Sequence, residues 1–166
     1  KEFVRQSIKA GYSIGEGPGP IDPLHCQRYP MQKRAPLGRF HAITNESLQT
    51  QFSHLELAQL ALEGGADLIQ YRDKQDLPTW EKIQKAQEIA NACKLYGAAF
   101  IVNDRADIAR ATVASGVHIG KQDLPPQLSR QIMGPTALIG KTANSIDEAL
   151  HAQNEPIDYI GVGPIF

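Results

Sequence analysis

LIQYRDK (residues 68–74) passes directly from aliphatic residues typical of a buried strand into a cluster of charge. Successive side chains of a strand alternate between its two faces. Gln70, Arg72 and Lys74 therefore share one face, and the two residues between them share the other. An amide, a guanidinium and an ammonium group on one face, where the strand ends, are typical of an anion-binding site.

Strand and helix patterns alternate on both sides of this segment, from residue 37 onward. Apolar segments typical of strands occupy residues 40–44, 66–72, 98–104, 117–120, 136–141 and 158–166. Ser53 and Ser145 each stand three residues before a glutamate, which is the spacing of a helix capping box. Three further helices are predicted. The first has Trp80 and Cys93 on its buried stripe and ends at Gly97, the second covers 108–115 and ends at Gly116, and the third covers 127–133. This order predicts a parallel β/α fold of about six strands and five helices.

Polar or glycine residues recur where the predicted strands end. They are Gln70, Arg72 and Lys74 on the second strand, Asn103 and Asp104 on the third, Gly120 leading to Asp123 on the fourth, Lys141 and Thr142 on the fifth, and Gly161 and Gly163 on the sixth. A barrel gathers such ends at one mouth, whereas an open, doubly wound sheet spreads them along an edge. Polar ends on five successive strands favour a (β/α)₈ barrel. Because a complete barrel needs at least about 200 residues, this one is expected to be incomplete, with about six β/α units.

Length, charge and apolar patterning exclude several classes of protein. The chain has 166 residues and a net charge of −1, so it carries no general basic field for nucleic acid or an anionic membrane. No apolar run approaches the roughly 20 residues of a membrane helix, and residues 1–13 lack the apolar core of a secretory signal. Cys26 and Cys93 lie far apart and predict free thiols in a reducing cytoplasm.

Asp104 and Asp123 are the candidate metal ligands of the predicted mouth. Mg²⁺ is usually held by one or two carboxylates, several waters and phosphate oxygens. Arg72 and Lys74 would then bind the phosphate oxygens. Two other roles stay open on the residues alone. Either aspartate can cap the helix that follows it, and Arg72 can form a salt bridge with one of them.

Two histidines on predicted strands are interpreted as packed or hydrogen-bonded core residues rather than as bases. These are His41 and His118, which both stand among apolar residues. Gly161 and Gly163 lack side chains where the last strand emerges. Such glycines favour close approach of a ligand to the backbone, and tight packing at a barrel corner is the alternative.

Five motifs, taken together and in order, resemble thiamine-phosphate synthase over about residues 38–166. They are QYRDK (70–74), VNDRADIA (102–109), GVHIGKQDLP (116–125), LIGKT (138–142) and DYIGVGPIF (158–166). The resemblance implies a (β/α)₈ barrel and a set of site residues. The implied substrate-binding residues are Gln70, Arg72, Lys74, Asn103, Thr142 and Gly163, with Arg72 and Lys74 as the catalytic cations, and the implied Mg²⁺ ligands are Asp104 and Asp123.

The resemblance also implies a reaction. Hydroxymethylpyrimidine diphosphate would lose diphosphate to give a pyrimidinylmethyl cation, which the nitrogen of hydroxyethylthiazole phosphate captures. Such a Mg²⁺-dependent transferase needs electrostatic stabilisation of a leaving group more than a general base. Two alternatives remain: a thiazole tautomerase-like isomerase, which needs a base and no Mg²⁺, and a non-catalytic truncated barrel. Lys121 and Gln122 depart from the family pattern, which commonly has Gln and Glu there, and this departure bears on substrate preference.

The two ends of the chain carry further expectations. Residues 1–25 resemble the C-terminal end of hydroxymethylpyrimidine-phosphate kinase, so residues 1–36 are expected to be the tail of a fused kinase plus a linker, and residues 37–166 the truncated barrel. A plain linker is the alternative. The partners expected are the two small-molecule substrates, without nucleic acid or membrane. The open strand edges of a truncated barrel allow a homo-oligomer.

Overall fold

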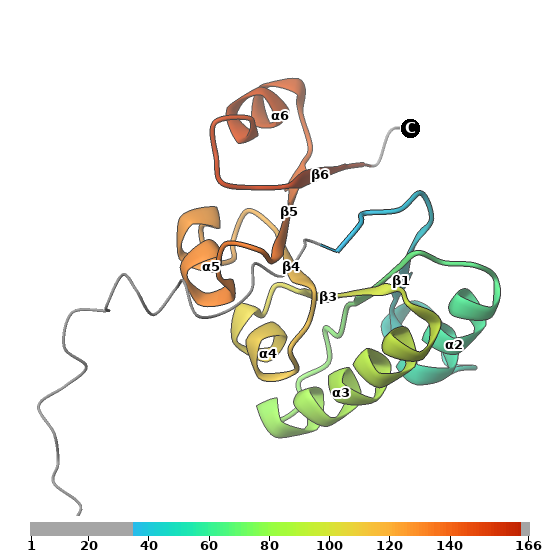
Figure 1. Cartoon of the computed structure of the whole chain (residues 1–166). Helices are drawn as coiled ribbons and strands as arrows, with labels where there is room; N and C mark the ends of the chain where they lie inside the picture. Colours follow the sequence, from blue (N-terminus) through green and yellow to red (C-terminus); the bar gives the residue numbers. More distant parts are fainter. Residues whose placement is uncertain (1–34, 164–166) are drawn as a thin grey trace, which may run out of the picture. The chain divides into compact units, whose positions relative to one another are not determined.

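The computed structural model describes residues 35–163, in which strands and helices alternate regularly (Figure 1). The strands are β1 (His41–Thr44), β2 (Leu68–Tyr71), β3 (Ala99–Asn103), β4 (Gly116–Ile119), β5 (Leu138–Ala143) and β6 (Tyr159–Val162). The helices, numbered as in Figure 1, are α2 (His54–Glu63), α3 (Thr79–Tyr96), α4 (Ala106–Ala111), α5 (Pro126–Met133) and α6 (Ile146–Ala152). A 3-10 turn, η2 (Glu46–Leu48), follows β1.

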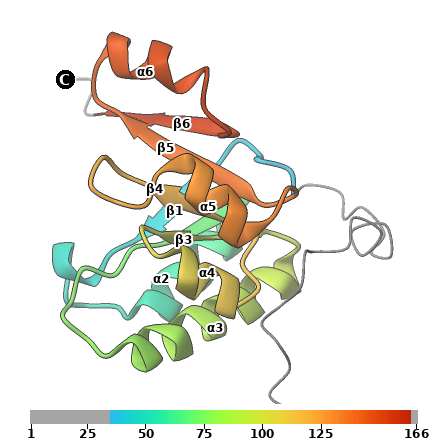
Figure 2. The same cartoon turned by 90° about the vertical axis from the view of Figure 1, so that its left-hand side faces the viewer.

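The six described strands form one parallel sheet whose spatial order, β1-β2-β3-β4-β5-β6, is the order of the chain. A doubly wound sheet reverses its strand order at a switch point, and this sheet has no reversal among its described strands. Figure 2 shows α2 to α5 on the same side of the sheet. Helices on one side and strands in unbroken sequence are the architecture of a (β/α) barrel, so the predicted incomplete barrel is confirmed, with six strands and five α-helices among the described residues.

Alternation along each strand separates two apolar layers. Ile69, Tyr71 and Val102 point outward and pack with α2, α3 and α4 in the larger cluster of buried residues. Leu68 and Ile101 point to the concave side, where they form a smaller cluster with Ala99 and Leu138. Because the register pairs Gln70 with Ile101 across the sheet, Gln70 lies on that same concave face as the alternation predicts.

The helix ends follow the predicted signals, with one exception. Ser53 and Glu56 form a complete capping box at α2, and Gly97 ends α3 in a left-handed conformation with φ of 70°. Ser145 caps α6 through the Glu148 amide, while the Glu148 carboxylate accepts from Asn144 instead of returning to Ser145. These contacts satisfy amide groups that would otherwise lack partners at the helix starts.

The prediction that α4 extends over 108–115 and stops at Gly116 was wrong. The helix begins earlier and ends at Ala111, and Gly116 is already the first residue of β4. A Cβ at position 116 would lie 2.0 Å from the carbonyl oxygen of Leu138, so the glycine permits close approach of β4 to β5. The left-handed position after α4 is instead taken by Val113, with φ of 52°.

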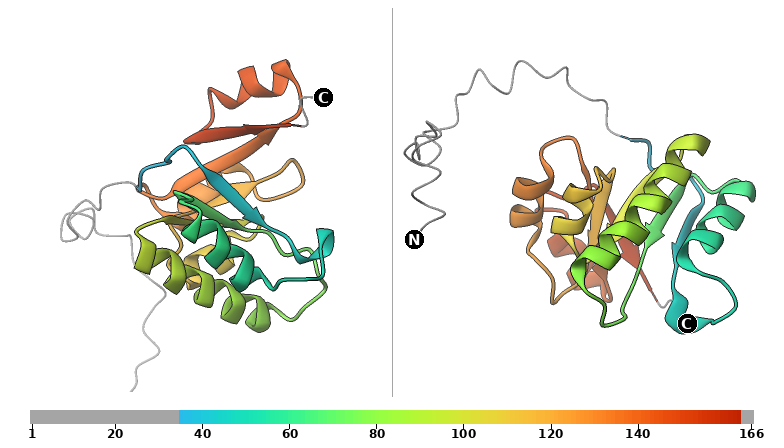
Figure 3. Two further views of the ribbon diagram at one scale, coloured as in Figure 1. Left: turned by 90° about the vertical axis from the view of Figure 1, so that its right-hand side faces the viewer. Right: turned by 90° about the horizontal axis from the view of Figure 1, so that it is seen from below.

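The sheet has open edges at β1 and β6 within the described residues. Ile160 and Val162 on β6 are 39% and 59% exposed, as expected of an edge. The curl of the sheet brings the two edge strands to face one another (Figure 3). The ring centroids of His41 on β1 and Tyr159 on β6 are 6.1 Å apart.

Val113 offers a direct test of backbone strain in this fold. Its side chain is 87% exposed, so nothing packs it into place, and a left-handed backbone costs a non-glycine residue about 1–2 kcal/mol. Val113→Gly removes this strain, which by itself would raise the free energy of unfolding by about 1 kcal/mol. Glycine also gains entropy in the unfolded chain, and this opposing effect reduces the increase. The measurement is the urea midpoint. Val113→Ala serves as the control because alanine bears the same backbone strain, and an equal gain in both variants would contradict this account.

Candidate functional site

Polar side chains from neighbouring strand ends meet on the concave side of the sheet. Gln70, near the end of β2, donates from Nε2 to Oδ1 of Asn103 at the end of β3, at 2.6 Å. Lys74, three residues beyond β2, forms an ion pair with Asp104 just after β3. These residues follow different strands, and the sequence predicts that they meet at one mouth. The structure brings them together by side-chain contact.

Asp104 reaches the mouth because the backbone turns sharply after β3. Simple alternation would place Asp104 on the face opposite Asn103. Asp104 instead adopts a left-handed conformation with φ of 65°, its N–H donates to the carbonyl of His118 at 2.7 Å, and the N–H of Arg105 donates back to Asn103. Asp is among the few residues that tolerate this conformation, and such strain is often found at functional sites.

Asp123 completes a charged group with Asp104 and Lys74. Its Oδ2 accepts from the N–H of Gly120 at 2.7 Å, which fixes the loop after β4. Burial raises the pKa of Asp123, and the neighbouring Asp104 carboxylate raises it further, despite the opposing effect of the Gly120 amide and of Lys74. Two carboxylates with only one ammonium group between them make a site where an added cation is favoured.

Arg72 and Gly163 are the two predicted site residues that the described contacts do not join to this group. The backbone N–H of Arg72 donates to Thr44 at 3.2 Å, and its half-buried guanidinium forms no ion pair with any residue of 35–163. Gly163 follows β6, and a Cβ there would meet no described atom within 4 Å. Its surroundings are compatible with the close approach of a ligand.

Thr142 belongs to a hydrogen-bonded chain inside the barrel that the sequence did not reveal. His118 is 8% exposed; its Nε2 lies 2.9 Å from Oγ1 of Thr142, and its Nδ1 lies 3.1 Å from the hydroxyl of Tyr159. Burial lowers the pKa of His118, so the neutral ring is favoured. The interpretation of His118 as a hydrogen-bonded core residue is confirmed. His41, by contrast, is exposed on the concave face, so its assignment to the core was wrong.

The sequence analysis did not identify two residues that belong to this hydrogen-bonded group, Tyr159 and Gly140. A Cβ at position 140 would lie 2.1 Å from Cζ of Tyr159 and 2.6 Å from Nδ1 of His118. The glycine therefore leaves the space in which the tyrosine and histidine rings meet. The available signal was the glycine itself within the apolar strand, because glycine in a strand marks close approach of another group.

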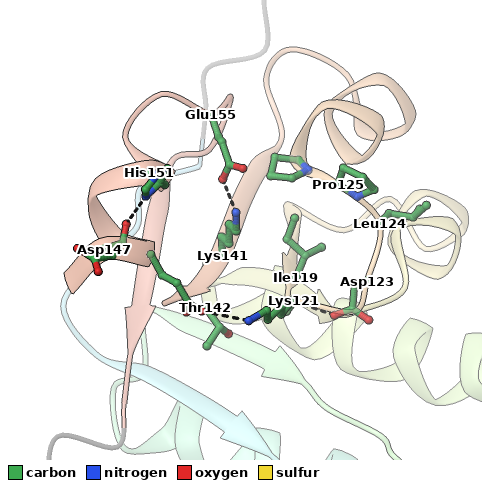
Figure 4. A pocket seen from close by; sticks show the side chains of 13 residues that line it. Ile119, Lys121, Asp123, Leu124, Pro125, Lys141, Thr142, Asp147, His151 and Glu155 are labelled. Atoms are coloured by element: carbon green, nitrogen blue, oxygen red, sulfur yellow. Dashed lines mark hydrogen bonds and ion pairs between the residues drawn. The ribbon is translucent and has the colours of Figure 1, made fainter. Parts of the chain in front are cut away.

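A cavity of about 480 Å³ adjoins the mouth, beside the loop after β4 and between β5 and α6 (Figure 4). Asp123 and Thr142 line it, together with Lys141, whose Nζ lies 2.5 Å from Oε2 of Glu155. Lys121, the departure from the family pattern, is 83% exposed and pairs with Glu148 at 3.5 Å. The Lys74–Asp104 pair lies in the open mouth outside this cavity, and we place the candidate site at the mouth because the opposing charges meet there.

The residues at the mouth fit a magnesium ion. Within residues 35–163 no group of three or more His, Cys, Asp or Glu side chains is arranged to hold a metal. Mg²⁺ needs fewer protein ligands, since waters and substrate phosphates complete its octahedron. The adjacent carboxylates of Asp104 and Asp123 are the hard oxygen donors that this ion prefers, and Lys74 provides the neutralising charge in their vicinity.

Comparison with known proteins gives a consistent result. The family model described as thiamine monophosphate synthase matches residues 40–166. A thiamine-phosphate synthase of Salinibacter ruber is 41% identical over 137 residues, which cover 82% of this chain and 60% of that protein. The thiamine biosynthesis bifunctional protein ThiM/ThiE of Symbiobacterium thermophilum is 35% identical over 93% of this chain and 33% of its own length.

A solved structure supports the same assignment. Thiamine phosphate pyrophosphorylase from Pyrococcus furiosus superposes with a TM-score of 0.70 at 36% identity, over 77% of this chain and 61% of that one. The present chain spans about 60% of the length of the Salinibacter relative. None of the helices between residues 35 and 163 has the length and apolar character required to cross a bilayer. The shared sequence, the barrel architecture and the model match show that this chain belongs to the thiamine monophosphate synthase family.

Proposed function

We propose that this chain carries the larger part of a thiamine-phosphate synthase module. The reaction breaks the bond between the pyrimidine methylene carbon and the diphosphate oxygen, and forms a bond from that carbon to the thiazole nitrogen. The observation that carries the proposal is the contact between Lys74 and Asp104 beside Asp123. It supports a site where cations and a metal face a departing diphosphate.

Each site residue has a role in this proposal. Asp104 and Asp123 would hold Mg²⁺, which would supply Lewis-acid stabilisation of the leaving diphosphate. Arg72 and Lys74 donate to the diphosphate oxygens. Three residues are left to contact the organic parts of the substrates, namely Gln70, Asn103 and Thr142, while Gly163 lies beside the phosphate of the thiazole substrate.

A thiazole tautomerase-like isomerase is the competing function. Such an enzyme moves a proton and therefore needs a base close to its substrate. His118 is the buried histidine nearest the mouth, but both its ring nitrogens already face hydroxyl groups. The presence of both Asp104 and Asp123 in one group supports the Mg²⁺-dependent transferase instead.

Calorimetry with hydroxymethylpyrimidine diphosphate tests the proposal. We expect the chain to bind this ligand in the presence of Mg²⁺ and to lose at least about 90% of its affinity in EDTA, because metal and cations act on the same phosphate oxygens. Release of diphosphate on addition of hydroxyethylthiazole phosphate would show the full transfer. Conversion of a thiazole precursor that survives EDTA would favour the isomerase, and an absence of binding under all conditions would favour the non-catalytic barrel.

Further parts of the proposal concern the rest of the molecule. We assign residues 1–36 to the tail of a fused kinase and a linker, and residues 37–166 to the synthase barrel. The bifunctional relative shows that fusions occur among similar proteins, and residues 1–34 lie outside the described structure. The proposed enzyme acts in the cytoplasm on small molecules. The buried thiol of Cys93, whose pKa burial raises to about 12, is compatible with that location.

A further inference from the structure

A polar group with two buried side chains lies on the outer side of β2, opposite the candidate site. It comprises Glu46 of η2, His54 of α2, Asp73 of the loop after β2, and Lys85 of α3. The side chain of Asp73 is 1% exposed and that of His54 2%. None of these residues takes part in the proposed reaction, so their burial calls for another explanation.

Asp73 uses both carboxylate oxygens to hold the residues on either side of it. Oδ1 accepts from the backbone N–H of Gln75 at 2.8 Å, and Oδ2 accepts from the hydroxyl of Tyr71 at 2.9 Å. Lys74, which pairs with Asp104 in the mouth, lies between Asp73 and Gln75. The carboxylate therefore holds the backbone just after the mouth lysine through Gln75, and it is itself anchored on the outer face by the hydroxyl of Tyr71.

Glu46 and His54 extend this hold to the neighbouring elements. Oε2 of Glu46 accepts from the side-chain amide of Gln75 at 2.7 Å, and Oε1 accepts from the backbone N–H of His54 at 2.7 Å. The ring of His54 meets Tyr71 edge-on at 4.8 Å, and its Nε2 lies 3.9 Å from both Glu46 and Asp73. Gln75 is thus held at its backbone by one acid and at its side chain by the other.

The same group reaches the backbone of the second mouth cation. Nδ1 of His54 lies 2.8 Å from Oγ1 of Thr44, and the carbonyl of Thr44 accepts from the backbone N–H of Arg72 at 3.2 Å. Lys85 lies 3.3 Å from Glu46 and 3.9 Å from Asp73, so it supplies positive charge to the two acids. One network on the helix side of the sheet therefore includes Asp73, contacts Gln75 directly, and contacts Thr44, whose carbonyl pairs with the backbone of Arg72.

We propose that Asp73, together with Glu46 and His54 behind it, is a positioning residue for the diphosphate-binding cations Lys74 and Arg72. The inference rests on the proposed function for the identity of the ligand. The positioning itself is a property of the ligand-free chain. Asp73 sets the direction of the loop from the outer face, and the ammonium group of Lys74 is delivered to the concave face.

Two ligand-free measurements test the positioning. Asp73→Ala is expected to raise the hydrogen-exchange rate of the Gln75 amide at least about tenfold, because that N–H loses its buried acceptor. The chemical shift of the Lys74 side-chain amine in ¹⁵N spectra should also change, because its ion pair with Asp104 would be lost. Asp73→Asn keeps an acceptor for Gln75 and should show a smaller change in both. Unchanged Gln75 exchange and an unchanged Lys74 signal in Asp73→Ala would overturn the proposal.

Binding of inorganic diphosphate with Mg²⁺ supplies the functional test, with Asp158→Asn as the matched control. Asp158 is a 5% exposed carboxylate that accepts from Arg130 and from the amide of Ile139, at the opposite ends of the strands. The Asp158→Asn substitution should lower the melting temperature of the protein without changing its affinity for diphosphate. Asp73→Ala should weaken the affinity about tenfold, as disruption of residues behind a binding site commonly does.

The outcomes separate this proposal from the proposed function. A parent chain that does not bind diphosphate counts against the synthase assignment alone, and the exchange and amine measurements then decide the positioning. A parent that binds diphosphate no better than Asp73→Ala overturns the positioning role. An equal loss of affinity in Asp158→Asn also overturns it, because general destabilisation would then account for the effect.

Discussion

Asp104→Asn is expected to reduce turnover by about 10³-fold, which corresponds to about 4 kcal/mol of lost stabilisation of the leaving diphosphate. Asparagine adopts the left-handed backbone as readily as aspartate, so the turn with φ of 65° should persist. The substitution should therefore remove the charge that we propose binds the metal, and it should leave the fold intact. Steady-state diphosphate release, with the fold checked by circular dichroism, measures the effect.

A second readout of Asp104→Asn has the opposite sign. Lys74 forms an ion pair with Asp104 in this structure, and the asparagine would free its ammonium group. Without Mg²⁺, the variant should therefore bind free diphosphate more tightly than the parent, whereas with Mg²⁺ it should bind more weakly. Equal turnover in parent and variant would exclude Asp104 as a metal ligand, and a weakened metal-free affinity would contradict the role assigned to Lys74.

Gly116→Ala is expected to lower the free energy of unfolding by about 3 kcal/mol or more, which is a large part of the stability of a typical domain. The new Cβ would lie 2.0 Å from the carbonyl oxygen of Leu138, and a backbone atom in the middle of a sheet cannot move aside as a side chain can. β4 and β5 would have to separate. Urea unfolding followed by circular dichroism measures the loss.

Gly163→Ala is the matched control for this prediction. A Cβ there meets no described atom within 4 Å, and its backbone is not among the glycines with positive φ. Its stability should stay within about 0.5 kcal/mol of the parent, as is usual for substitutions away from packed contacts. If both alanine variants unfold at the same urea concentration, close contact of β4 and β5 is not the reason for Gly116. A loss of substrate affinity in Gly163→Ala alone would support its proposed place beside the ligand.

Much of the architecture could be predicted because local patterns and the global fold agree. Alternation in residues 68–74 correctly separated Gln70 and Lys74 from Tyr71 and Asp73, which hydrogen-bond to one another. The capping box at Ser53 and the left-handed Gly97 marked helix ends correctly. These signals act over one turn or one strand, a range in which a single sequence suffices.

The remaining features depend on contacts between distant parts of the chain. His118 meets Thr142 and Tyr159 across 24 and 41 residues, and no local pattern encodes such pairings. Gly116 looked like a helix end, although the approach of Leu138 gives it a place inside the sheet. Trp80 fitted the helical stripe, but it lies in the first turn of α3 and is 59% exposed. Tertiary packing decided each of these positions against the local signal.

The agreement between strand order and chain order has a consequence for synthesis on the ribosome. Each strand that leaves the exit tunnel pairs with the strand made just before it, so only one β/α loop has to close at each step. The nascent chain can therefore extend its sheet one unit at a time, at the pace of translation. The growing edge at any moment is the one that the next strand will cover, which shortens the time during which that edge is open to pairing with another chain, whereas the edge at β1 is not covered by this addition.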